Sequence, residues 1–391
     1  MLAQRPPMGW NSWNTFTGEI NEEMIMQTAD AMVENGLLDA GYEYLVIDDC
    51  WSEKKRDENG RLVADKNKFP SGMKALAEYV HSKGLKFGMY SCCGAYTCAE
   101  FPGSYGHEYA DAATFAEWEI DFLKYDYCFR DNNIPSEIHY RKMGLALANC
   151  GRDILFSACN FGVNHTENWI KTTGAHMWRS TADIFDCWGS IRNIVEHQFE
   201  LLTTNYRGCF NDMDMLVVGM DGSGNVARDE RLSFEEYKLH FSAWALFGSP
   251  LMIGCDIRNM SEETKAILMN KEVLAVSQDI ACNQVALHKH PPYDQFLAWR
   301  LLDGGDIAVG VFNMGDEPSI NFSGCMLPQE FGWTPESNTR LLLRDLWDGS
   351  EKYLVVETKG DGTFYDSVHS VDVAVTDANG KIVAQSEEDD A

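Results

Sequence analysis

Aspartate residues follow several short apolar runs in the first two-thirds of the chain. The set comprises Asp48, Asp49, Asp126, Asp183, Asp214 and Asp256. One such Asp more often caps a helix or shapes a turn than takes part in catalysis. Because five of eight runs end in this way, we expect these side chains to meet. Packed carboxylates raise one another's pKa, which suits either a metal ion or acid–base chemistry on a hydroxyl-rich substrate.

Aromatic residues near the same positions favour a sugar over a metal. Trp10, Trp13, Trp51 and Tyr90 lie close to the ends of these runs, and flat rings suit the apolar face of a pyranose. His176 comes too early in its run to join the carboxylates. Mg²⁺ or Ca²⁺ could still bind to oxygen ligands alone, so a metal stays the less favoured alternative. We expect no metal and no cofactor.

Hydrolysis of a glycoside needs two carboxyl groups, one on each side of the bond that breaks. Lys124 stands two residues before Asp126, and alternate residues of a strand point to the same side. The Lys124 ammonium can therefore help to keep Asp126 ionised. Arg179 precedes Asp183 by four residues, close to the end of another apolar run.

The elements that would hold these residues alternate between strands and helices. Eight strand–helix pairs can be drawn between residues 8 and 278, which predicts a (β/α)8 TIM barrel with its chemistry at the C-terminal ends of the strands. Later runs are short and separated by Gly, Asp and Pro, as expected for antiparallel strands. These runs are 296–300, 306–313, 339–347 and 371–376. We therefore predict a catalytic barrel over 1–286 and a small C-terminal antiparallel β-sandwich domain over 287–391.

Charge and composition narrow the classes of partner. The net charge is −28, and nucleic acids and anionic membranes both require basic patches, so neither is expected. No apolar run reaches the 18 residues of a membrane span and no secretory leader is visible, which predicts a cytoplasmic protein. The 12 Cys residues are too sparse for a disulfide scaffold. Whether the protein forms homo-oligomers is left open.

Several long motifs resemble glycoside hydrolase family 27, the family of α-galactosidases and α-N-acetylgalactosaminidases. They run in order along the predicted barrel. The motifs are MGWNSW (8–13), AGYEYLVIDDCW (40–51), RDENGRLVADKNKFPSGMKALAEYVHSKGLKFGMY (56–90), TCAEFPGSYGHE (97–108), LKYDYC (123–128), WRSTADIFDCW (178–188) and NDMDML (211–216). The C-terminal part resembles the family only through LRDLWDG (343–349).

The resemblance implies a role for each matching residue. Asp126 would be the nucleophile and Asp183 the acid/base. The substrate-binding positions would be Asp48 and Asp49 at the O4/O6 side of the sugar, Lys124 and Arg179 as sugar contacts, Trp13 and Tyr90 as aromatic walls, and Asp214 and Met215 as lining residues. Cys98 and Cys128 match a pair that forms a disulfide beside the active site.

One departure concerns the C2 position of the sugar. Family α-galactosidases carry Cys-Glu-Trp where this chain has Cys159, Asn160 and Phe161. The resemblance implies a retaining exo-glycosidase that cleaves terminal α-D-galactosides of an oligosaccharide or glycoconjugate, and the intact Asp pair favours galactose over arabinose. Asn160 motivates an α-N-acetylgalactosaminidase as one alternative. A sugar-binding protein without catalysis is the alternative of another class.

Overall fold

The computed structural model describes residues 2–290, 294–315 and 339–356. Eight parallel strands form one sheet in which chain neighbours are sheet neighbours, and β8 lies beside β1. Their bounds are β1 Met8–Asn11, β2 Tyr44–Val46, β3 Lys86–Cys92, β4 Phe122–Asp126, β5 Leu155–Ala158, β6 Met177–Arg179, β7 Phe210–Asp212 and β8 Leu251–Ile253. The order matches the predicted barrel.

The barrel closes between the segment after β7 and strand β8. Leu216 forms a parallel bridge with Ile253, the Leu216 N–H donates to the carbonyl of Met252 at 2.7 Å, and the Leu216 carbonyl accepts from Gly254 at 3.0 Å. Without these contacts the sheet would present an open edge on each side. All strand ends that carry the Asp residues therefore face one mouth.

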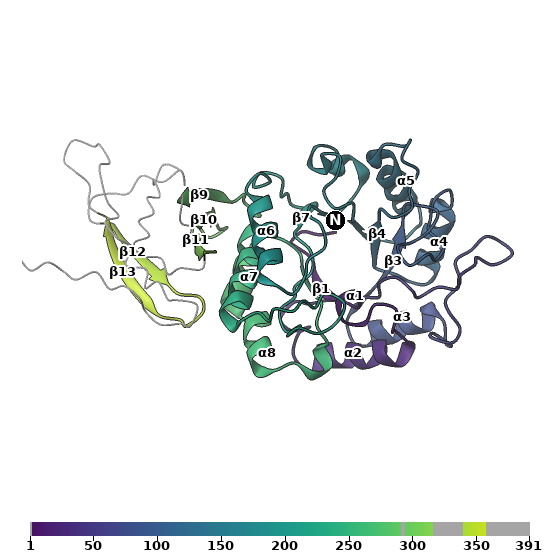
Figure 1. The fold of residues 1–391 in the computed structure, drawn as a ribbon, viewed down its shortest axis with the longest axis horizontal. Coiled ribbons are helices and arrows are strands. Elements are labelled where there is room, and N and C mark those ends of the chain that lie inside the picture. The colour runs from purple at the N-terminus through teal and green to yellow at the C-terminus, as the bar shows by residue number, and fades with distance from the viewer. Residues whose placement is uncertain (1, 291–293, 316–338, 357–391) are drawn as a thin grey trace, which may run out of the picture.

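Helices surround the strands (Figure 1). Their bounds are α1 Trp13–Phe16, α2 Glu22–Glu34, α3 Met73–Ser82, α4 Glu108–Glu117, α5 Ser136–Ala148, α6 Trp188–Gln198, α7 Phe234–Phe247, α8 Glu262–Leu268 and α9 Lys271–Ser277. Local sequence marks where several begin. Asn21 accepts from the Met24 N–H to cap α2, and Ser233 with Glu236 forms a capping box at α7.

The inside of the barrel is a separate apolar cluster. It joins residues from six strands and one loop, and the members are Tyr44, Val46, Phe122, Leu155, Met177, Phe210, Met215 and Met252. Gly88 on β3 leaves room for it, because a Cβ there would lie 2.7 Å from a Val46 methyl and 3.0 Å from the Phe122 Cβ. The barrel is thus filled beneath its mouth rather than hollow.

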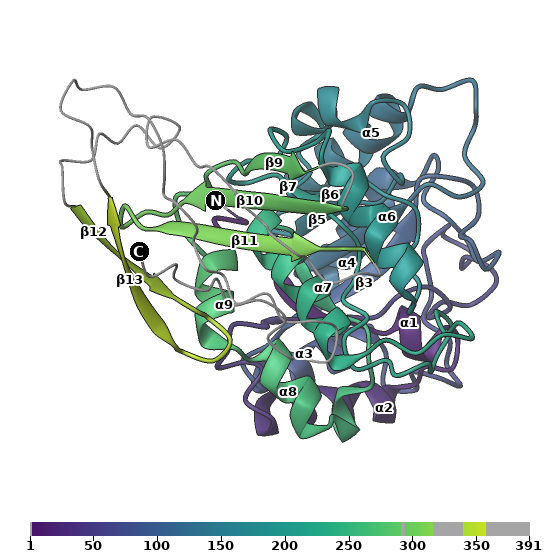
Figure 2. The ribbon, with the colours of Figure 1, turned by 60° about the vertical axis from the view of Figure 1, so that its left-hand side comes forward.

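The described residues of the C-terminal part form two antiparallel sheets. One contains β9 Ala286–His290, β10 Gln295–Leu301 and β11 Ile307–Asn313, and the other pairs β12 Thr339–Arg344 with β13 Glu351–Val356. Figure 2 shows β10 and β11 lying across helix α7 of the barrel. Trp347 also reaches α7, where its Nε1–H donates to the Ser242 hydroxyl at 3.1 Å. The domain boundary at 286 stays a prediction.

Several expected elements differ in detail. The predicted alternation assigns one helix to each strand, but two short 3₁₀ helices, η1 Thr166–Asn168 and η2 Ile170–Thr173, follow β5. The helical segment after β8 divides into α8 and α9. Asn270 causes this division, because its side chain accepts from the N–H groups of Glu272 and Val273 and so caps a new helix. The strand expected over 371–376 lies outside the described residues.

Candidate active site

Asp126 is the last residue of β4, and both of its carboxylate oxygens accept hydrogen bonds. The Tyr90 hydroxyl donates to Oδ2 at 2.9 Å, and the Tyr127 backbone N–H donates to Oδ1 at 2.8 Å. Tyr90 is one strand away on β3 and its side chain is buried. Asp126 is 6 % exposed, so its carboxylate is held in one orientation at the mouth of the barrel.

Burial and neighbouring charges act in opposite directions on Asp126. Burial raises the pKa of this carboxyl above its ordinary value, while Lys124, the Tyr127 N–H and the Tyr90 hydroxyl lower it and Asp48 raises it. The net shift is upward. Among the groups that lower this pKa, the nearby cation of Lys124 has the largest effect, so it favours the ionised form of Asp126 most.

Lys124 provides that cation and joins two strand ends. Its Nζ lies 2.7 Å from Oδ2 of Asp48, which also accepts from the Asn11 side chain at 2.8 Å. Burial opposes the charge on Lys124, but Asp48 and then Asp126 raise the pKa of this ammonium well above its usual range. Lys124 therefore stays protonated beside the buried Asp48 carboxylate.

The Asp49 carboxylate is held by the loop that follows β3. Its Oδ1 accepts from the Cys50 N–H at 2.7 Å and its Oδ2 from the Ala99 N–H at 3.0 Å. Burial raises the pKa of this carboxyl, against the lowering effect of those N–H groups. Asp48 and Asp49 are both 2 % exposed, so the expected O4/O6 pair is rigidly placed.

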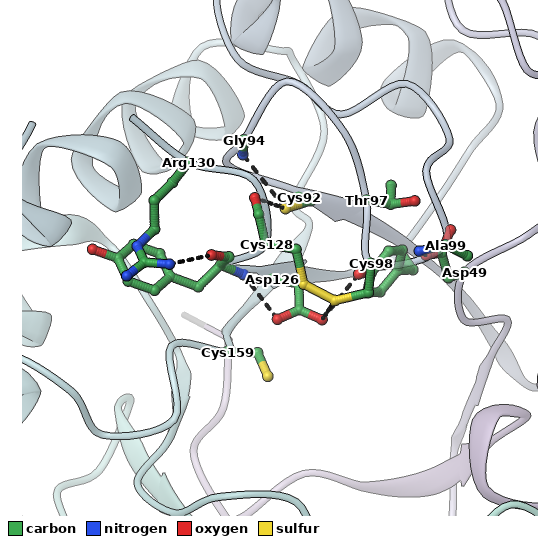
Figure 3. Close-up of a disulfide and its surroundings, with 12 residues drawn as sticks. Asp49, Cys92, Gly94, Thr97, Cys98, Ala99, Asp126, Cys128, Arg130 and Cys159 are labelled. Carbon is green, nitrogen blue, oxygen red and sulfur yellow. Dashed lines mark hydrogen bonds between the residues drawn. A yellow bond between two sulfur atoms is a disulfide. The ribbon is translucent and has the colours of Figure 1, made fainter. Parts of the chain in front are cut away.

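A disulfide joins this loop to the segment after β4. Cys98 and Cys128 are bonded, with their Cα atoms 5.4 Å apart, as the resemblance implied. Figure 3 shows the disulfide directly beside the Asp126 carboxylate, and the Cys98 Sγ lies 3.8 Å from Asp126 Oδ2. The bond therefore ties the loop carrying Ala99 to the segment that follows Asp126.

A second group of charges is centred on Arg179, the last residue of β6. Its Nη2 lies 2.6 Å from Oδ2 of Asp214 and 2.9 Å from Oδ1 of Asp183. Arg179 and Asp214 are buried, whereas the Asp183 side chain is 68 % exposed. Burial raises the pKa of the Asp214 carboxyl and Arg179 opposes this effect. Asp183 is thus anchored through one oxygen at the solvent side of the mouth.

Cys159 lies between the charged residues around Asp126 and those around Arg179. The sequence alone indicated no role for it. Its Sγ is 4.0 Å from Arg179 Nη1, and Figure 3 places it below the Asp126 carboxylate. Burial raises the pKa of this thiol, and the negative charge of Asp126 adds to that effect. Its position directly after β5, at the level where other strands end in Asp, was the available sequence signal.

Asn11 and Asp212 are two further residues that sequence reasoning did not single out. Asn11 ends β1 and holds Asp48. Asp212 ends β7, where burial raises the pKa of its carboxyl to about 6 despite Arg179, and its Oδ1 accepts from the Asp214 N–H at 2.9 Å. Both lie within quoted motifs, MGWNSW and NDMDML, at the last residue of a strand.

Other expected residues have different surroundings. Met215 belongs to the apolar cluster inside the barrel, and the partly buried Trp13 packs against that cluster. Asn160 is fully buried, and its Nδ2 donates to the Thr166 hydroxyl at 2.7 Å and the Val163 carbonyl at 3.2 Å. Asp256 pairs with Arg258 at 2.7 Å and starts a 3₁₀ helix, η3 Ile257–Asn259. The structure therefore does not place the Asn160 amide or the Asp256 carboxylate among the charged groups described above.

Metal-ligating atoms approach one another at the disulfide. Within the described residues, one ligand atom from each of Cys98, Asp126 and Cys128 lies within 4.8 Å of the others. Because the two sulfurs are bonded to each other, they offer no thiolate to a metal.

In the part of the chain that the structure describes, no helix is both long and apolar enough to cross a membrane.

Known proteins match this chain over most of its length. A family model described as Alpha galactosidase A matches residues 5–279. Alpha-galactosidase 2 of Arabidopsis thaliana is 51 % identical over 279 residues, which are 71 % of this chain and 68 % of the relative. The α-galactosidase of Cyamopsis tetragonoloba is 43 % identical over 356 residues, covering 90 % of this chain and 82 % of the relative.

Solved structures agree with these relatives. α-Galactosidase I of Mortierella vinacea superposes with a TM-score of 0.83 at 34 % identity, covering 90 % of this chain and 93 % of that one. The α-galactosidase of Saccharomyces cerevisiae with raffinose gives a TM-score of 0.78 at 32 % identity, covering 88 % and 82 %. The protein is a glycoside hydrolase of the α-galactosidase type. The chain belongs to glycoside hydrolase family 27, the α-galactosidase family.

Proposed function

We propose that this protein hydrolyses terminal α-D-galactosides with retention, with Asp126 as the nucleophile and Asp183 as the general acid and base. One observation carries the assignment of the nucleophile: two hydrogen bonds and the nearby Lys124 ammonium fix and charge the Asp126 carboxylate. Such a carboxylate can attack an anomeric carbon but is poorly placed to collect protons from solvent.

The exposed carboxyl of Asp183 supports the complementary role. Arg179 binds its Oδ1 at 2.9 Å, which leaves Oδ2 to face the leaving group. In the first step Asp183 donates its proton to the glycosidic oxygen as that bond breaks, and Asp126 forms an ester with the anomeric carbon. In the second step the Asp183 carboxylate takes a proton from water, whose oxygen attacks the same carbon and releases Asp126. Asp183 ends protonated, ready for another cycle.

Positive charge and buried carboxylates suit a hydroxyl-rich sugar. Asp48 and Asp49 offer acceptors on one side of the nucleophile, and Lys124 and Arg179 offer donors. We propose that Asp48 and Asp49 accept from the O4 and O6 hydroxyls of galactose. Trp13, Tyr90, Asp214 and Met215 would shape the remaining wall. The substrates would be α-galactosides on oligosaccharides or glycoconjugates.

The C2 position separates the main proposal from its alternative. The Asn160 amide nitrogen already donates to Thr166 and Val163, so it is not free to bind a sugar. Asn160 therefore gives no support to recognition of an N-acetyl group. Initial rates on p-nitrophenyl α-galactoside, α-N-acetylgalactosaminide and β-L-arabinopyranoside decide between the sugars, and we expect the galactoside to be cleaved fastest.

An Asp126→Asn variant tests the nucleophile in the same assay. Turnover of the galactoside should fall by at least about 1000-fold, while the melting temperature stays close to that of the parent protein. Normal turnover would remove the assignment, and absence of turnover on all three glycosides by the parent protein would favour a sugar-binding protein.

The cytoplasmic location also stays a proposal. Because disulfides persist mainly in oxidising compartments, thiol titration of protein isolated from its own cells would show whether Cys98 and Cys128 are bonded there.

A further inference from the structure

A cavity of about 460 Å³ lies between the loop that follows β4 and the loop that follows β5. Residues of the first loop and of the start of α5 form one wall, and Asn164 and Trp169 form the other. Both loops leave the C-terminal ends of barrel strands, so the cavity is on the catalytic face. Its volume lies in the range of small-molecule sites.

The cavity offers hydrogen-bonding groups of both kinds. Arg130 lines the cavity and brings guanidinium N–H donors to its wall, with the guanidinium 4.1 Å from the centre of the Tyr127 ring. Asn132 is exposed at the rim, and Glu137 contributes a carboxylate that also binds Arg141. Donors and acceptors therefore face the same space.

Trp169 adds a flat aromatic wall that is held in place. Its Nε1–H donates to the Asn164 carbonyl at 2.9 Å, and its ring packs 5.9 Å from the ring of Tyr140. The Asn164 side chain is fixed in turn, because its Nδ2 donates to the Ser136 hydroxyl at 2.6 Å. A rigid ring beside a fixed amide loses little conformational entropy when a ligand binds.

The mixture of groups selects the class of ligand. The Glu137 carboxylate disfavours an anion, and Arg130 with the amides disfavours an apolar molecule. A neutral ligand with hydroxyl groups and a flat apolar face satisfies all of them. We propose that this cavity is a second saccharide-binding site, which holds a neutral sugar unit other than the galactose that is cleaved. The link to catalysis rests on the proposed function, whereas saccharide binding does not.

The cavity is also joined to the nucleophile through the backbone. Tyr127 lines it and donates its N–H to Asp126, and Arg130 Nη1 approaches the Tyr127 carbonyl at 3.5 Å. An oligosaccharide held here would be retained beside the mouth of the barrel. The site should therefore lower the KM for oligosaccharides and leave the kinetics of a small aryl galactoside unchanged.

Kinetics of two variants test the consequence for substrates. Trp169→Ala should raise the KM for raffinose about 5–10-fold, and Asn132→Ala, which alters only an exposed side chain, about twofold. The kcat/KM for p-nitrophenyl α-galactoside should stay within about twofold in both. Tyr353→Ala, at a 66 % exposed aromatic residue of β13, is the matched control and should leave the kinetics of both substrates unchanged.

A direct measurement of saccharide binding tests this proposal independently of the proposed function. Saturation-transfer NMR with sucrose and with β-1,4-mannobiose is measured on an Asp126→Asn protein and on the same protein carrying Trp169→Ala. Signals that are present in the first and lost in the second support the site, even if no galactoside is ever cleaved. Absence of signal for both disaccharides, or signals that Trp169→Ala leaves intact, would overturn it.

Discussion

The Lys124 ammonium lies 2.7 Å from the Asp48 carboxylate, and its charge also acts on Asp126 at the end of its own strand. This pair joins the ends of β2 and β4, which are separated by β3 in the sheet. Burial disfavours the ionised form of Asp126, and that cation is the largest of the effects that favour it. The pairing of Lys124 with Asp48 therefore bears directly on the state of the proposed nucleophile.

Replacement of Lys124 by Met should impair catalysis most at low pH. Without the ammonium the pKa of Asp126 rises further above its ordinary value, so the nucleophile is protonated over a wider acid range. We expect kcat/KM for an aryl α-galactoside to fall by about 100-fold or more and its acid limb to move to higher pH. Lys124→Arg, which keeps a cation, should move that limb much less. An unshifted acid limb in Lys124→Met would contradict the electrostatic role.

Replacement of both Cys98 and Cys128 by Ser should affect stability and substrate binding together. Loss of the cross-link lowers the free energy of unfolding by about 2–4 kcal/mol. It also loosens the loop in which the Ala99 N–H holds Asp49, so KM should rise more than kcat falls. Chemical denaturation and steady-state kinetics measure both effects. Cys150→Ser, at a partly buried free thiol, is the control, and an unchanged KM in the double variant would argue against this role of the loop.

Replacement of Asp212 by Asn should stabilise the protein only above acid pH. Burial raises the pKa of the folded-state carboxyl to about 6, so the protonated form is favoured by folding. The resulting stability is present below the unfolded pKa of about 3.9 and is lost as the pH rises through about 6. The amide that replaces the carboxyl in the variant stays neutral at every pH.

We therefore expect Asp212→Asn to gain about 1–3 kcal/mol at a pH of about 7.5 and almost nothing at a pH of about 4. Thermal or urea unfolding at the two pH values measures the difference. Asp229→Asn, at an exposed position, should show no such pH dependence. An equal gain at both pH values would mean that burial of the charge is not the cause.

Replacement of Asn160 by Ala should cost stability rather than sugar selectivity. The side chain is fully buried and binds Thr166 and Val163, so its removal costs about 1–3 kcal/mol. The ratio of kcat/KM for the galactoside and the N-acetylgalactosaminide should change less than about threefold. Thr166→Val, which removes the hydroxyl partner, should give a similar loss. A large change in the ratio would place position 160 in contact with the sugar.

The barrel could be predicted from sequence because its pattern is local. Apolar runs of three to seven residues alternate with capped helices, and each pair obeys the rules for parallel units. The pairings of Lys124 with Asp48 and of Arg179 with Asp214 join strand ends that lie far apart in the chain. The fold predicts that these four side chains meet at one mouth of the barrel, but it does not predict which of them form ion pairs.

Other features depend on loop geometry that periodicity does not report. Asn160 follows β5 as an Asp follows other strands, yet its loop folds so that the amide is turned to Thr166. Asp256 likewise stands after a strand but binds Arg258, two residues away. Cys159 is the converse: its position directly after β5 was a signal, but its residue type did not indicate that its sulfur would lie 4.0 Å from Arg179 Nη1.

Covalent trapping tests the central assignment most directly. A slow fluorinated α-galactosyl fluoride should label the protein once, and mass spectrometry of the digested protein should find the sugar on the peptide that carries Asp126. The label should vanish in Asp126→Asn and be retained in Asp183→Asn. Attachment of the sugar to Asp183, or to any other residue, would contradict the account.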